Sequence, residues 1–175
     1  MREPTEAWFR ATYAEHYPAV VRYGLRRLGS MTAAEELAQE VFLTAWRRRA
    51  DVPGQALPWL YGVARRVLAN SLRRTEPVPA ELPEFAVPAG GLDEVLDVRA
   101  ALATLSEPDQ ELLRLIGWEE LSVSEAARVL GCNRAVCAVR LHRARKRLQA
   151  ALSPRPPIRG ERTMSTRPLS TEEAA

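Results

Sequence analysis

A proline-rich stretch near the middle of the chain limits what this sequence can fold into. The stretch "TEPVPAELPEFAVPAGG", residues 75–91, holds four prolines and two glycines among seventeen residues. Proline lacks the amide hydrogen that a helix interior requires, so the stretch is predicted to be a flexible linker. It leaves two modules the size of small domains, residues 1–74 and 92–152. The polar, proline-punctuated segment 153–175 is predicted to be a disordered tail.

The first module is predicted to be helical throughout. Pro18 is expected to begin a second helix after a short, aromatic-rich one. The segment "TAAE", residues 32–35, has the pattern of a capping box and is expected to start the next helix. Apolar residues at 34, 37, 38, 41, 42, 45 and 46 form one stripe along that helix. Pro58 is expected to open the last helix of the module.

The second module is predicted to hold four helices, the last two forming a helix-turn-helix. Ser106 is expected to cap the second of the four. The segment "SVSE", residues 122–125, is a capping box that starts a short helix ending at Gly131, and Asn133 is expected to cap a long last helix. A short helix, a glycine turn and a long helix are the plan of helix-turn-helix DNA-binding motifs. The predicted fold class is therefore all-α: two small helical domains joined by a proline-rich linker.

Charge is strongly segregated along the chain, although the net charge is only +3. Residues 1–75 hold 12 arginines against 7 acids, residues 76–120 hold 2 against 11, and residues 121–152 hold 7 cations against 1 acid. Two basic blocks around an acidic middle predict two surfaces that meet a polyanion. In the last helix, an apolar stripe would point a basic face toward the major groove of DNA. The residues predicted on or beside that face are Arg134, Ala138, Arg140, His142, Arg143 and Lys146.

Other classes of protein find little support. No apolar run approaches the roughly 18 residues of a membrane span and the N-terminus lacks a signal peptide, so no membrane insertion and a cytoplasmic location are expected. Two cysteines and two distant histidines are a poor metal site, and no cofactor motif is present. The sequence also lacks a glycine-rich phosphate loop and a nucleophile elbow, so no enzymatic activity is expected.

Two pairs of motifs resemble the extracytoplasmic-function (ECF) subfamily of bacterial RNA polymerase sigma factors. The segments "AEELAQEVFLTAWRR" (34–48) and "PWLYGVARRVLANSLRR" (58–74) are similar to the second conserved region of that family. The segments "LSEPDQELLRLIGWEELSVSEAARVLG" (105–131) and "RLHRARKRL" (140–148) resemble its fourth region. The resemblance covers roughly residues 8–152, and the ordered pair of regions across a linker is highly specific.

The resemblance implies a sigma factor that binds core RNA polymerase and directs promoter-specific initiation, as an alternative sigma factor under the control of an anti-sigma factor. The first module would bind the polymerase clamp and open DNA at the minus-ten element, and the second would read the minus-thirty-five element. By position, the polymerase-facing residues would be Glu36, Gln39, Glu40 and Leu43. The minus-ten residues would come from the loop and helix at Asp51, Gln55, Arg65, Arg66, Asn70 and Arg73. Ala138 stands where many relatives have a cation, so the promoter sequence cannot be copied from a relative.

Several alternatives stay open at this point. A plain helix-turn-helix regulator would explain residues 92–152, but not the pattern of residues 31–74. Trp46 and Trp59 lie on apolar stripes, so core packing is favoured over base stacking. Cys132 and Cys137 occupy the two positions of a hydrophobic staple around Asn133. The competing hypothesis makes these thiols a redox pair, with a pKa lowered by the helix N-terminus.

Overall fold

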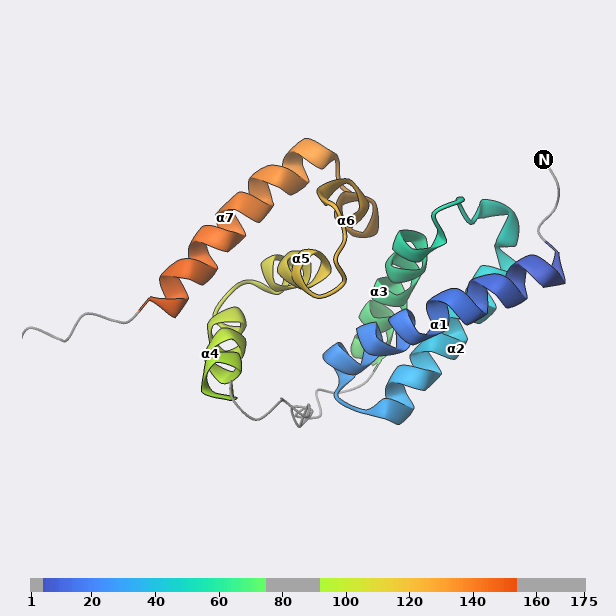
Figure 1. Cartoon of the computed structure of the whole chain (residues 1–175), viewed down its shortest axis with the longest axis horizontal. Helices are drawn as coiled ribbons and strands as arrows, with labels where there is room; N and C mark the ends of the chain where they lie inside the picture. Colours follow the sequence, from blue (N-terminus) through green and yellow to red (C-terminus); the bar gives the residue numbers. More distant parts are fainter. Residues whose placement is uncertain (1–4, 75–91, 154–175) are drawn as a thin grey trace, which may run out of the picture.

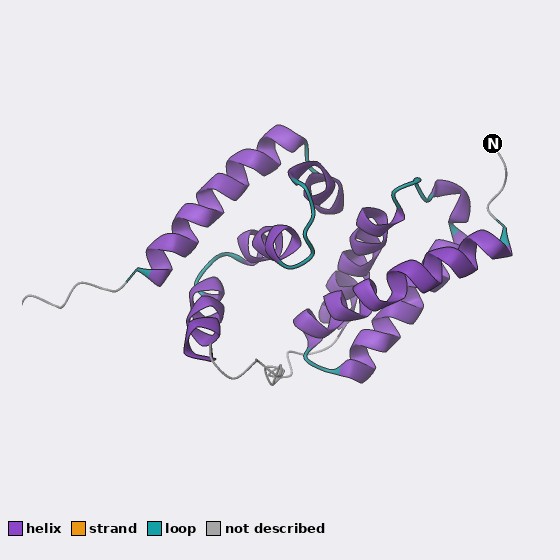
Figure 2. Cartoon of the chain, in the orientation of Figure 1, coloured by secondary structure: helices purple, strands orange, loops and turns teal. Residues whose placement is uncertain are grey.

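The structure is a computed structural model that describes residues 5–74 and 92–153 (Figure 1). Every regular element in these ranges is a helix (Figure 2), which confirms the all-α prediction for the described part of the chain. The predicted linker, the predicted tail beyond residue 153 and residues 1–4 lie outside the described residues. The elements are α1 (Glu6–Leu28), α2 (Met31–Arg47), the short 3-10 helix η1 (Arg49–Asp51), α3 (Ala56–Arg74), α4 (Leu92–Ala103), α5 (Glu107–Gly117), α6 (Val123–Leu130) and α7 (Arg134–Leu152).

Helix α1 runs unbroken through Pro18, so the prediction of two separate helices was wrong. A proline inside a helix removes one backbone hydrogen bond, to the carbonyl four residues earlier. That carbonyl belongs to Ala14, and both Ala14 and Pro18 are exposed, so water can solvate the carbonyl. On the other side of the helix, Val20 and Tyr23 are buried in the core. Packing therefore holds the helix together where the local sequence favours a break.

The start of α2 also differs from the prediction. The cap is Ser30, whose hydroxyl accepts a hydrogen bond from the backbone N–H of Ala33 at 3.3 Å, and Thr32 lies inside the first turn. Gly29 ends α1 with a left-handed φ of 74°, which reverses the chain within two residues. The two helices then cross closely at Gly24, where an added Cβ would lie 3.0 Å from the Leu37 side chain. The prediction at Thr32 was wrong because the tight turn at Gly29 lets the helix begin two residues earlier, with Ser30 as its cap.

The ends of the helix-turn-helix are as predicted. Ser122 and Glu125 form a reciprocal capping box at the start of α6. Gly131 ends that helix with a φ of 68°, and the Asn133 side chain accepts a hydrogen bond from the backbone N–H of Val136 at 2.8 Å. Ser106 precedes α5 as predicted, but its side chain makes no hydrogen bond to the helix backbone.

Apolar side chains of both modules form one continuous cluster. Helix α6 packs against α3, as the two adjacent helices in Figure 1 show. The contact is close at Gly62 of α3, where an added Cβ would lie 3.9 Å from the Cα of Val129 in α6. The small residues Ala126 and Ala127 of α6 are fully buried or nearly so. The second module therefore sits with its helix-turn-helix directly on the first.

Candidate nucleic-acid and polymerase interfaces

Helix α7 has one buried face and one exposed basic face. Cys137, Leu141 and Ala144 are buried, as the predicted inward stripe requires. The exposed side carries the residues predicted to face DNA near the start of the helix: Arg134, Ala138, His142, Arg143 and Lys146. Because Asn133 caps the helix, the backbone N–H groups of its first turn also point toward this end. A capped basic helix with a free face has the form of a recognition helix for the major groove.

Arg140 differs from its neighbours on α7. Its Nε lies 3.2 Å from Oδ1 of Asp109 in α5, and Arg147 pairs with the other oxygen of the same carboxylate. Asp109 is buried, which by itself would raise its pKa, but hydrogen bonds from Arg140, Ser106 and Arg147 outweigh burial and hold the pKa below the ordinary value. Arg140, predicted on or beside the DNA-facing side, is half-buried and joins α7 to α5.

The outer face of α2 carries the four residues predicted to face polymerase. Glu36, Gln39 and Glu40 are exposed, and Leu43 is 53% exposed. An exposed leucine beside two carboxylates, opposite a fully buried apolar stripe, is an acidic and apolar surface suited to a basic helical partner.

Trp46, expected in the core, is 38% exposed. Its ring contacts Phe9 at a centroid distance of 5.2 Å, and the guanidinium of Arg49 lies 5.0 Å from the ring centroid. Trp46 lies in the last turn of α2, where the buried stripe ends at Ala45. The expectation failed because a stripe at helical spacing does not show where the neighbouring helix stops covering it.

The loop and helix assigned to the minus-ten element are largely accessible. Arg65, Arg66 and Asn70 are exposed on α3, whereas the Arg73 side chain lies outside the described residues. Asp51 is paired with Arg48, at 3.0 Å.

Gln55, in the same loop, contacts the second module. Its side-chain oxygen accepts a hydrogen bond from Arg128 of α6, at 3.1 Å.

Trp59 was expected to pack in the core and not to stack on a base. Its side chain is half-buried and packs against the apolar core, as that expectation requires.

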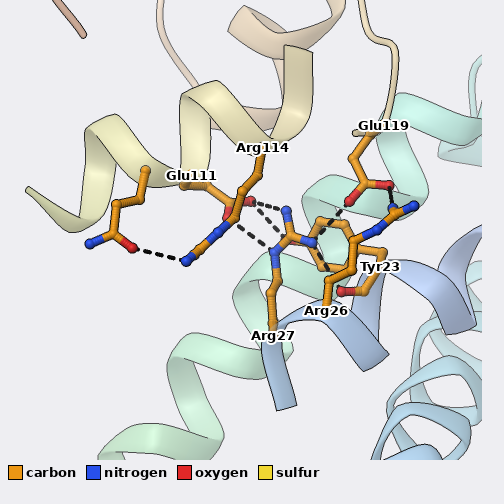
Figure 3. Close-up of polar contacts among 7 residues, drawn as sticks. Tyr23, Arg26, Arg27, Glu111, Arg114 and Glu119 are labelled. Carbon is orange, nitrogen blue, oxygen red and sulfur yellow. Dashed lines mark hydrogen bonds and ion pairs between the residues drawn. The ribbon is translucent and has the colours of Figure 1, made fainter. Parts of the chain in front are cut away.

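A set of charged residues that the sequence did not single out joins the two modules (Figure 3). Arg26 and Arg27 lie in the last turn of α1, Glu111 lies in α5, and Glu119 lies just after it. Arg27 pairs with Glu111 at 3.0 Å and with Glu119 at 3.0 Å, and Arg26 pairs with Glu119 at 2.8 Å. The acidic middle of the sequence was the available signal, but composition alone does not show which arginines its glutamates would meet.

The two cysteines have the arrangement of a hydrophobic staple. Cys132 directly precedes the cap Asn133, and Cys137 is the fourth residue of α7 and is fully buried. Burial, followed by the neighbouring Cys132, raises the pKa of the Cys137 thiol. The expected lowering by the helix N-terminus is therefore wrong for Cys137, because desolvation of the thiolate dominates. A buried thiol of raised pKa favours the staple over the redox pair.

The described residues show neither a metal site nor a membrane span. Across residues 5–74 and 92–153, no three histidine, cysteine or acidic side chains come together in a group that could hold a metal ion. Among the helices of the same two ranges, none has the length and hydropathy needed to cross a bilayer.

Comparisons with known proteins agree with this geometry. The model of Sigma-70 region 2 matches residues 12–77, and that of Sigma-70 region 4 matches residues 96–148. The chain is 30% identical over 159 residues to the ECF RNA polymerase sigma factor SigL of Mycobacterium tuberculosis, covering 83% of this chain and 89% of SigL. It is 28% identical to the RNA polymerase sigma factor YlaC of Bacillus subtilis, covering 78% and 87% of the two chains.

Among solved structures, the sigma factor RpoE of Bartonella quintana, in complex with the anti-sigma factor NepR, has a similar fold. It aligns with a TM-score of 0.67 at 25% identity, over 82% of this chain and 96% of RpoE. Two sigma-factor regions in order, in a chain whose described elements are all helices, identify the protein: it belongs to the ECF subfamily of bacterial RNA polymerase sigma factors, which bind core RNA polymerase and direct promoter-specific initiation.

Proposed function

We propose that this sigma factor uses three different exposed surfaces to bind core polymerase, the minus-ten element and the minus-thirty-five element. The α2 face of Glu36, Gln39, Glu40 and Leu43 binds core polymerase. The loop before α3 and the outer face of α3 take up the minus-ten element, through Asp51, Gln55, Arg65, Arg66, Asn70 and Arg73. The exposed face of α7 reads the minus-thirty-five element. The protein carries out no covalent chemistry itself, since polymerase makes the RNA.

The arrangement of α7 is the observation that supports this proposal most strongly. Its cap, its buried stripe and its exposed basic face are all present, and two of the exposed positions, Arg134 and Ala138, fall in the first two turns of the helix. These are the turns that contact base edges in helix-turn-helix proteins. The small side chain of Ala138 lets the helix approach the groove, His142 faces base edges, and the long side chains of Arg143 and Lys146 reach phosphates.

A partner that holds the protein inactive is part of the proposal. Among the solved structures that resemble this chain, the sigma factor RpoE is bound to the anti-sigma factor NepR. We infer that an anti-sigma factor also controls this chain. Its work on polymerase and promoter DNA places the protein in the cytoplasm.

Transcription in vitro tests the proposal. The full-length chain is first mixed with core polymerase without DNA, and binding is measured by gel filtration. The complex is then supplied with a fragmented bacterial genome, and RNA start sites are mapped. We expect stable core binding and a set of start sites that share two sequence elements. A chain that binds DNA but not core polymerase would instead be a plain helix-turn-helix regulator.

A further inference from the structure

Two valines near the start of α7 lie on its exposed side. The Val136 and Val139 side chains are each 53% exposed. Within the described part of the chain, neither is among the residues that form the apolar core or pack against it. The two are three residues apart on one helix, so their Cβ atoms are neighbours, at about 5–6 Å. The pair therefore forms a small apolar patch that the described residues leave uncovered.

Val139 points almost directly away from the buried stripe of α7. An α-helix turns by about 100° per residue, so Val139 lies about 200° round the helix from the buried Cys137. Val136 lies beside it, about 60° further round. Both fall within the first two turns after the cap Asn133. These are the turns that come nearest to base edges in helix-turn-helix proteins.

The cations around the valine pair leave it open. Arg140, which follows Val139 directly, is drawn toward α5, since its Nε lies 3.2 Å from Oδ1 of the buried Asp109. Arg143 and Lys146 are exposed one and two turns beyond Val139. The result is an apolar patch bordered by cations. This arrangement suits a helix in the major groove, where cations contact phosphates and other side chains contact the bases.

A valine side chain can recognise one chemical group in the major groove. It neither donates nor accepts a hydrogen bond, and thymine is the base that presents a C5-methyl group there beside its polar atoms. A valine against that methyl group removes apolar surface of both partners from water, whereas against the other bases it leaves polar groups without water. Helix propensity does not account for the pair, because valine is a poorer helix former than alanine or arginine.

We propose that Val136 and Val139 determine specificity within the minus-thirty-five element by contacting the C5-methyl groups of thymines. This inference rests on the proposed function for the role of α7. Bases are about 3.4 Å apart along one strand, so two side chains about 5–6 Å apart reach methyl groups on the same or on neighbouring base pairs. The element is therefore expected to contain thymine where it faces the start of α7.

Replacing thymine by uracil removes the methyl group and nothing else. The preferred minus-thirty-five element is first selected from a randomised library with the full-length chain and core polymerase. Each thymine of that element, on either strand, is then replaced by uracil one at a time, and the affinity is measured. We expect wild-type affinity to fall about fourfold at one or two of these positions, which is the usual effect of one buried methyl group.

The variants Val136→Ser and Val139→Ser, singly and combined, test which side chains contact the methyl groups. Serine removes both methyl groups of valine at a similar helix propensity, and both positions are exposed, so helix content should not change. In the combined variant the ratio of thymine to uracil affinity should fall from about four to about one. Leu152→Ser, at an exposed apolar residue at the end of the same helix, is the matched control and should keep the ratio. Arg143→Ala should bind both DNAs more weakly and also keep the ratio.

Three results would overturn the inference. The first is a preferred element without thymine, or equal affinity for thymine and uracil at every position of it. The second is a methyl effect that survives in the combined serine variant, because other side chains would then contact the methyl groups. The third is a loss of core polymerase binding in that variant with its DNA preference unchanged, which would make the valine pair a protein contact.

Failure of the proposed function reads out separately. The wild-type chain would then give no transcription with core polymerase on genomic DNA. The same comparison of thymine with uracil would be made on sites that the full-length chain selects by itself, and the same results would support or overturn the role of the two valines.

Discussion

At the scale of single residues, the cations of α7 divide into those that hold the fold and those that remain free. Arg140 and Arg147 share the buried Asp109, whereas no such partner was found for Arg143 within the described residues. The sequence could predict which side chains point outward, because the apolar stripe sets the rotation of the helix. It could not predict the partners, because Asp109 is 31 residues away from Arg140 in the chain.

Asp109→Asn should destabilise the protein by about 1–3 kcal/mol, since it weakens two charge-assisted hydrogen bonds to a buried group. The pKa of Asp109 is held below its ordinary value of 3.8, so its contribution to stability is fully present above the unfolded-state pKa. That contribution is lost as the pH falls through the folded-state pKa. Urea unfolding at pH 7 and at pH 3 measures the effect. The difference in the free energy of unfolding between wild type and variant should be smaller at pH 3 than at pH 7. An equal difference at both pH values would show that the charge of the carboxylate does not stabilise the fold.

His142→Ala should change the ranking of promoter sequences, while Arg143→Ala should weaken all of them alike. A side chain that faces base edges discriminates among bases, whereas an arginine on phosphate contributes affinity without sequence preference. The Arg143 variant should also lower the salt dependence of binding by about one unit of slope. A library randomised at the minus-thirty-five element measures both effects. The reverse assignment of the two effects would mean that α7 is rotated relative to the DNA.

At the scale of elements, the helix ends that follow local rules were predictable and those that depend on packing were not. The capping box at Ser122 and the cap at Asn133 involve residues within three positions of each other, so the sequence contains all of the chemistry. Pro18 carries an equally strong local signal for a helix end, yet α1 continues because α2 and the core pack against both of its halves. A local sequence signal for a helix end is overridden where tertiary packing buries a large apolar area on both sides of it.

Ser122→Ala should destabilise the second module by about 1 kcal/mol, since the backbone N–H of Glu125 loses its cap. The matched control is Ser124→Ala, two residues further on and exposed, where no cap is lost. Thermal unfolding followed by circular dichroism gives both values. Equal effects of the two substitutions would show that the box contributes nothing to stability.

Glu36→Lys combined with Glu40→Lys should weaken binding to core polymerase by at least tenfold while helix content stays the same. The two carboxylates are one turn apart on the exposed face of α2, and Leu43 follows them on the same face. Glu107→Lys with Glu120→Lys makes the same change of charge on the other module and serves as the control. Competition with a labelled sigma factor for core polymerase measures the affinity. Unchanged affinity of the α2 variant would show that this face of α2 does not bind core polymerase.

At the scale of the whole molecule, the two helical modules were predictable from the linker and the arrangement between them was not. Charge segregation singled out the acidic middle of the sequence but not its partners, and the glutamates at 111 and 119 meet Arg26 and Arg27 of the first module. Such pairing depends on contacts more than 80 residues apart, which no local pattern encodes. The packed arrangement of the two modules therefore comes from tertiary contacts, and we expect transcription from a two-element promoter to require its opening, because two touching modules span less than the distance between the two elements.

A reversible disulfide between α3 and α6 tests that claim most directly. A Cβ at position 62 would lie 3.9 Å from the Cα of residue 129, so the two Cα atoms fall within the separation that a disulfide allows. Gly62→Cys and Val129→Cys are introduced together with Cys132→Ser and Cys137→Ala, and Gly62→Cys alone in the same background is the control. The protein is oxidised with diamide and purified before core polymerase is added. We predict that the oxidised form binds core polymerase normally but transcribes at least tenfold more slowly from a two-element promoter, and that reductant restores the rate. Full transcription by the oxidised, cross-linked protein would contradict the account.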